Sequence, residues 1–74
     1  MRKGANTAFV ILFGKNLRLI RKDQKISMET LAHLSDMEYS QISRIENGKI
    51  NTSISTVKLL ADSLNVPIKK LFDF

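Results

Sequence analysis

Residues 27–49 constrain the fold more than any other part of this sequence. The segment reads SMETLAHLSDMEYSQISRIENGK, and it predicts two short helices that meet at a sharp turn. Ser27 is a good N-cap for the first helix, and Asn47-Gly48 is a strong signal for the end of the second. Apolar residues recur at helical spacing and define one inward face, which comprises Leu31, Ala32, Met37, Ile42 and Ile45.

Helical spacing continues on both sides of this segment. A first helix is predicted to end near Lys22, and Gly14 makes its start uncertain because glycine costs a helix up to about 1 kcal/mol relative to alanine. Residues 23–26 connect it to helices at 28–35 and about 39–46, with Asp36 in the turn. The inward face of the first helix comprises Val10, Phe13, Leu17 and Ile20.

Two further helices are predicted after the loop at residues 49–52. Ser53 caps a fourth helix, and Pro67 suits the first turn of a short fifth helix. The fourth helix is expected to turn Ile54, Val57, Leu60, Ala61 and Leu64 inward, and the fifth carries Ile68, Leu71 and Phe72. The sequence therefore predicts an all-α fold, a compact bundle of five helices.

Composition limits the chemistry that such a bundle can perform. The 74 residues suit one small domain, with no room for a separate sensor, and the absence of cysteine excludes disulfides and thiolate metal sites. His33 is the only histidine, and with Glu29 one turn before it we interpret it as a surface residue. No nucleophile–base set is apparent, so we expect no catalytic residue, no metal and no cofactor.

The net charge of +5 favours a polyanionic partner. The apolar run at residues 8–13 is too short to span a membrane and lacks a small-residue cleavage site. We therefore expect a cytoplasmic protein that binds no membrane.

The two central helices resemble the helix-turn-helix of the phage-repressor-like family (lambda repressor/Cro, or Xre). Ala32 is the small residue that allows a close helix crossing, Met37 is the apolar residue beneath the turn, and Ile42 and Ile45 support the following helix. The ENGK sequence at the end of that helix completes the pattern, and the resemblance covers about residues 13–72. It implies a lambda-repressor-like DNA-binding domain in which the second and third helices form the motif.

The sequence departs from the family pattern at two positions. The family usually has glycine in the turn, where this chain has Asp36, and aspartate tolerates left-handed geometry better than most residues. The family typically has a phosphate-binding glutamine where this chain has Met28, which cannot donate a side-chain hydrogen bond. Phosphate binding at this end is then expected from the free N–H groups of the helix start and the Ser27 hydroxyl.

The third helix, about residues 39–46, is expected to enter the major groove of double-stranded DNA. The residues predicted to read bases are Tyr39, Ser40, Ser43 and Arg44, and a solvated or phosphate-bound Arg44 is the alternative. The predicted phosphate-binding set is Ser27, Met28, Gln41, Asn47, Gly48, Lys49 and Arg21. Arg21 and Glu46 match a family ion pair that bridges the first helix to the end of the third.

Apolar residues are concentrated at both ends of the chain, at residues 8–13 and at Leu71, Phe72 and Phe74. They either complete the core or form a patch that pairs two subunits. We divide the chain into an N-terminal extension at 1–12, which is part of the first helix or a dimer contact, and a single domain at 13–74. Because one helix reads too few base pairs to regulate alone, a homodimer on a palindromic operator is favoured.

These features predict a sequence-specific transcriptional regulator that acts by occupying its operator, with no small-molecule effector. The short chain, Ser35 and the YSQIS segment look similar to controller proteins of restriction–modification systems, and the chain also looks like small repressors of mobile elements. An antitoxin or another protein-interaction module that also binds DNA is the main alternative. A membrane-surface peptide and an RNA-binding protein are less favoured, the latter because no aromatic stacking platform is visible.

Overall fold

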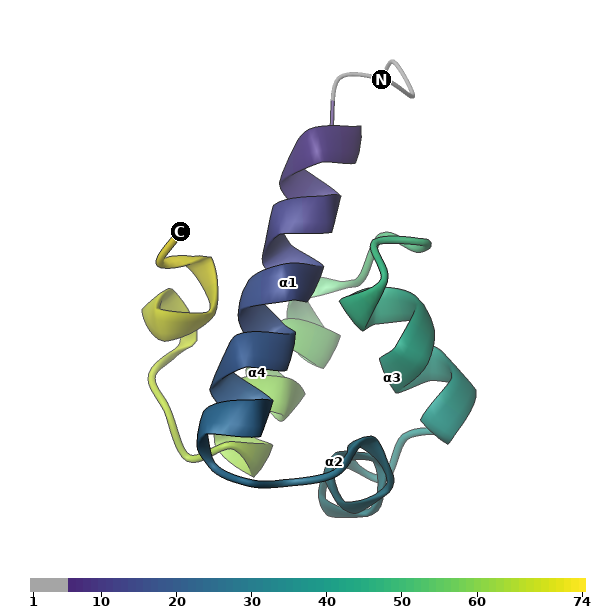
Figure 1. Cartoon of the computed structure of the whole chain (residues 1–74), viewed down its shortest axis with the longest axis vertical. Helices are drawn as coiled ribbons and strands as arrows, with labels where there is room; N and C mark the ends of the chain where they lie inside the picture. The colour runs from purple at the N-terminus through teal and green to yellow at the C-terminus, as the bar shows by residue number, and fades with distance from the viewer. Residues whose placement is uncertain (1–5) are drawn as a thin grey trace.

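The computed structural model describes residues 6–74, which fold into four α-helices and one 3₁₀ helix. In chain order they are α1 (Thr7–Asp23), α2 (Met28–Ser35), α3 (Tyr39–Glu46), α4 (Ile54–Ser63) and the 3₁₀ helix η2 (Ile68–Phe72). Figure 1 shows α1 upright in the middle with α4 behind it, η2 on one side, α3 on the other and α2 at the lower end, beneath α3. Residues 6–74 contain no strand, which confirms the all-α prediction.

Each of the five helices contributes a fully buried side chain to one core. These side chains are Leu17, Leu31, Ile42, Leu60 and Leu71, and each is 0% exposed. Isolated helices of eight to ten residues, such as α2, α3 and α4, are marginal in water. The burial of these apolar side chains therefore holds the short helices in place.

The prediction of a fifth α-helix is wrong, because residues 68–72 form a 3₁₀ helix. Its backbone makes an i→i+3 bond from Lys70 N–H to the Pro67 carbonyl, and 3₁₀ helices are stable only in such short pieces. The element is held at its end by Asn16 of α1, whose side-chain amide donates to the carbonyls of Lys70 (2.9 Å) and Leu71 (2.8 Å). This tie anchors η2 beside α1, where Leu71 fills the core.

The prediction that Ile54 faces inward is also wrong, because its side chain is 86% exposed. Val57, Leu60, Ala61 and Leu64 are buried as expected. Ile54 is the first residue of α4, after the Ser53 cap, and no described element covers that end of the helix. Helical spacing gives the direction of a side chain but not whether a neighbour lies there.

The structure gives the start of the first helix, which the sequence left uncertain. α1 begins at Thr7 and runs without a break through Gly14, so residues 7–12 of the predicted extension belong to this helix, and residues 1–5 lie outside the described part. Among residues 6–74, no helix combines the length and the apolar character that crossing a membrane requires.

Candidate nucleic-acid interface

The turn between α2 and α3 is built by the backbone of Asp36. This residue adopts the left-handed conformation, with φ 55° and ψ 41°, and its N–H bonds to the His33 carbonyl at 3.2 Å. Met37 N–H then bonds to the Ala32 carbonyl at 2.9 Å, which closes the end of α2. Aspartate thus occupies the conformation for which the family usually supplies glycine, at a cost of about 1–2 kcal/mol.

α3 presents one buried and one exposed face. Ile42 and Ile45 are 0% and 1% exposed, so they fix the helix against the core. On the other side Tyr39 is 48% exposed, Ser40 and Arg44 are exposed, and no described residue pairs with the Arg44 guanidinium. The structure thus brings three of the four predicted base-reading side chains to an open polar face.

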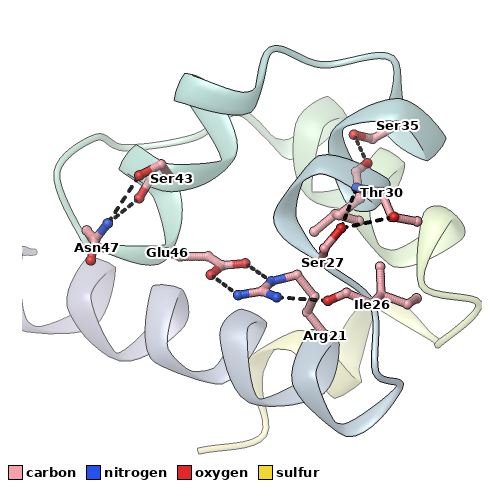
Figure 2. Close-up of polar contacts among 9 residues, drawn as sticks. Arg21, Ile26, Ser27, Thr30, Ser35, Ser43, Glu46 and Asn47 are labelled. Carbon is pink, nitrogen blue, oxygen red and sulfur yellow. Dashed lines mark hydrogen bonds and ion pairs between the residues drawn. The ribbon is translucent and has the colours of Figure 1, made fainter.

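Ser43, the fourth predicted base-reading residue, is half-buried and already has a partner. The Asn47 side-chain amide donates to the Ser43 carbonyl at 2.8 Å and lies 3.4 Å from its hydroxyl oxygen (Figure 2). This contact caps the last turn of α3. Gln41 is half-buried on the flank of the same helix.

A buried ion pair fixes α3 to α1. The Arg21 guanidinium donates from Nε to Glu46 Oε2 (2.6 Å) and from Nη2 to Glu46 Oε1 (2.9 Å), while Nη1 donates to the Ile26 carbonyl at 2.8 Å (Figure 2). Their side chains are only 7% and 3% exposed. The side-chain hydrogen bonding of Arg21 to the Glu46 carboxylate raises the pKa of Arg21 further above its already high value, so the guanidinium stays charged.

This burial limits Arg21 as a phosphate ligand. Three of the five guanidinium N–H groups are used within the protein, and Arg21 is the least exposed member of the predicted phosphate set. Its main role is to hold α3 against α1.

Gly14 allows the same two helices to approach closely, and this role was missed from the sequence. A Cβ atom at Gly14 would lie 2.3 Å from the Ile45 carbonyl oxygen and 2.7 Å from that of Glu46. Both are backbone atoms of α3, so any side chain at this position forces the helices apart. The available signal was its position seven residues before Arg21, which places both residues on one face of α1.

The backbone N–H groups of the turn that follows α3 are hydrogen-bonded within the protein. The N–H groups of Asn47, Gly48 and Lys49 donate to the carbonyls of Ser43, Ile45 and Arg44 at 3.0, 3.1 and 2.8 Å. These three N–H groups therefore close the helix and are not free to donate to a phosphate. The exposed Lys49 ammonium remains available, and no described residue pairs with it.

The start of α2 offers backbone donors rather than side chains. The Ser27 hydroxyl accepts from Thr30 N–H and lies 3.0 Å from the Thr30 hydroxyl, so it is engaged as the N-cap (Figure 2). The Met28 side chain packs against the core, which explains how methionine replaces a phosphate-binding glutamine without leaving an exposed apolar group. The N–H groups of Met28 and Glu29 have no partner within the helix.

Comparisons with known proteins agree with this geometry. A family model described as helix-turn-helix (HTH_3) matches residues 17–71. The solved structure of the restriction-modification controller protein C.AhdI from Aeromonas hydrophila superposes with a TM-score of 0.86 and 35% identity, covering 88% of this chain and 98% of that one.

Relatives of two kinds are similar in sequence. Control protein C.BamHI of Bacillus amyloliquefaciens is 37% identical over 86% of this chain and 80% of its own length. The transcriptional repressor RghR of Bacillus subtilis is 40% identical over 80% of this chain, which spans only 44% of that protein. The chain therefore belongs to the HTH_3 (Xre-like, phage-repressor-like) helix-turn-helix family of DNA-binding transcriptional regulators.

Proposed function

We propose that this chain regulates transcription in the cytoplasm by inserting α3 into the major groove of a specific DNA operator. The observation that carries the proposal is the exposed polar face of α3, fixed from behind by Ile42, Ile45 and the Arg21–Glu46 pair. A recognition helix must present donors and acceptors in a fixed orientation, and this arrangement provides both.

Tyr39, Ser40 and Arg44 are the proposed base-reading side chains, with Ser43 in a secondary place because Asn47 contacts it. Tyr39 and Ser40 lie in the first turn of α3, the part of a recognition helix that reaches deepest into the groove. Arg44 lies one turn further on and is long enough to bond guanine at O6 and N7.

Selection of bound duplexes from a random DNA pool tests the proposal directly. We expect one enriched sequence, with a half-site on each side of a two-fold centre. Recovery of unrelated sequences at physiological salt would contradict sequence-specific binding.

Replacing Arg44 with alanine should relax the preference at one base pair of the selected half-site. The expected loss of discrimination is about 1–3 kcal/mol, because a bidentate guanine contact contributes that much. Competition titrations with single-base variants of the operator measure it. Arg18→Ala is the matched control, since Arg18 is an exposed arginine on α1. Equal weakening on every sequence would instead assign Arg44 to phosphate.

Lys49 and the start of α2 are proposed to hold the phosphates on either side of the groove. Lys49→Ala should weaken binding evenly on all sequences and reduce the slope of log K against log salt by about 0.9, the value for one phosphate contact. Fluorescence anisotropy between about 50 and 200 mM salt measures the slope. An unchanged slope removes Lys49 from the interface.

We further propose a homodimer that binds a palindromic operator as a controller-type regulator. The similarity extends over 80% of C.BamHI and 98% of C.AhdI, whereas it spans less than half of RghR. Mapping the selected operator onto the source genome tests the subclass, because a controller should bind beside restriction–modification genes. The exposed apolar side chains around Phe9 also favour a protein partner, and co-purification of a second protein would support the antitoxin-like alternative.

A further inference from the structure

All four phenylalanines of the chain gather at one end of the molecule. Phe9 of α1 lies with its ring centroid 6.0 Å from that of Phe72 and 5.4 Å from that of Phe74, and Phe13 lies 5.1 Å from Phe72. Only Phe13 is buried, while Phe9, Phe72 and Phe74 are 51%, 38% and 48% exposed. The cluster thus joins the two ends of the described chain without being covered by it.

A groove opens beside this cluster, between the first turns of α1 and α4. Its volume is about 140 Å³, and its lining includes Phe9, Phe13, Val57 and Phe72. Ile54, the most exposed large apolar side chain among the described residues, stands at the rim of the same groove. The surface therefore carries an exposed apolar side chain, that of Ile54, next to an apolar groove.

Such a surface can be complementary to itself. In a two-fold dimer the same patch occurs on both partners, so a projection on one copy can fill the hollow on the other, and the reverse. Among residues 6–74, no charged side chain lines the groove. Lys58, one turn after Ile54, is neutralised by Asp62 at 2.7 Å. Two copies of a protein with net charge +5 repel each other, and the uncharged lining of this groove adds no further repulsion where the copies would meet.

A second exposed apolar surface on α1 lacks these properties. Leu12 and Leu19 are 46% and 67% exposed and are seven residues apart on one face of the helix. Exposed cations at Lys15, Arg18 and Lys22 lie along the neighbouring face. Charge therefore disfavours a second copy there.

From these observations we infer that the groove formed by Phe9, Phe13, Val57 and Phe72, with Ile54 at its rim, is the surface through which two copies of this chain pair. The phenylalanines lie outside the family-matched residues 17–71, so the family match does not itself supply this cluster. The inference rests on the proposed homodimer and assigns its interface. None of the proposed DNA-binding residues lines the groove, so pairing leaves α3 open.

Sedimentation equilibrium of the free protein tests the assignment, with Ile54→Glu and Leu19→Glu as matched variants. Both add one carboxylate at an exposed leucine or isoleucine on a helix, and glutamate in the first turn of α4 suits the helix dipole. Ile54→Glu should raise the dimer dissociation constant by about 100-fold or more, because each dimer loses the burial of two isoleucines. Leu19→Glu should leave it unchanged, and circular dichroism should show both variants folded.

DNA binding separates this inference from the proposed function. Ile54→Glu should keep the affinity for a single half-site and lose the cooperative gain on a full operator. A wild-type protein that stays monomeric at millimolar concentration overturns the inference, as does dissociation by Leu19→Glu to the same extent as by Ile54→Glu. A dimer that responds as expected but ignores every duplex would uphold the interface and overturn the proposed function.

Discussion

Replacing Glu46 with alanine should lower the free energy of unfolding by about 3–5 kcal/mol, because it leaves the buried Arg21 guanidinium without its counterion. The two side chains are 7% and 3% exposed and share two hydrogen bonds. A core of this size contributes only about 3–5 kcal/mol in total, so the variant should be largely unfolded at 25 °C. Urea denaturation followed by circular dichroism measures the loss, and DNA binding should disappear with it.

Two further variants make this result specific to burial. Asp62→Ala removes the exposed partner of Lys58, an i,i+4 pair whose side chains are about 60% exposed, and should cost no more than about 0.5 kcal/mol. The double variant Arg21→Met/Glu46→Leu should be more stable than Glu46→Ala, since it removes both charges together. A loss below about 1 kcal/mol for Glu46→Ala would show that water reaches the pair and that it does not fix α3.

Gly14→Ala should destabilise the protein by about 2–3 kcal/mol, although alanine is the better helix former by about 1 kcal/mol. The new Cβ atom would lie 2.3 Å from the Ile45 carbonyl oxygen, and this atom belongs to a backbone that can move only if α3 moves. Because α3 carries the proposed base-reading side chains, the folded fraction should also bind its operator more weakly. Urea denaturation and anisotropy titrations measure the two effects.

Substitutions at the neighbouring exposed residue Lys15 separate the effect of the Cβ clash at Gly14 from the effect of helix propensity. Lys15→Ala and Lys15→Gly change the same helix without a tertiary contact, so their difference gives the intrinsic preference for alanine over glycine in α1. At Gly14 we expect the opposite order, with glycine giving a more stable protein than alanine. An increase in stability on Gly14→Ala would mean that the helices tolerate a larger separation than the structure shows.

Local signals in the sequence located α2 and α3 to the residue. Ser27 caps α2, the left-handed Asp36 ends it, and Asn47-Gly48 closes α3 with Gly48 at φ 67°. Each of these signals acts within one turn of chain, so neighbouring residues alone are sufficient to read it. The same is true of the Ser53 cap, which accepts from Thr56 N–H at the start of α4.

Features that depend on distant neighbours were not predictable in this way. The exposure of Ile54 depends on which element covers the end of α4, and the role of Gly14 depends on the α3 backbone opposite it. Residues 68–72 form a 3₁₀ helix whose end is held by hydrogen bonds from the side-chain amide of Asn16, more than fifty residues earlier. The Arg21–Glu46 pair was expected only because the sequence resembles a family in which such a pair occurs.

The contact between Gly48 and Ile11 has a consequence for how the protein would measure its operator. A Cβ atom at Gly48 would lie 2.8 Å from Ile11 Cγ1, so the end of α3 rests directly on the first turns of α1. Two residues earlier on α1, Phe9 lines the proposed pairing groove. In the proposed dimer, α1 would therefore set the distance between α3 and the two-fold axis. In such a dimer, the length of α1 would determine the number of base pairs between the half-sites, while the side chains of α3 would select the base sequence of each half-site.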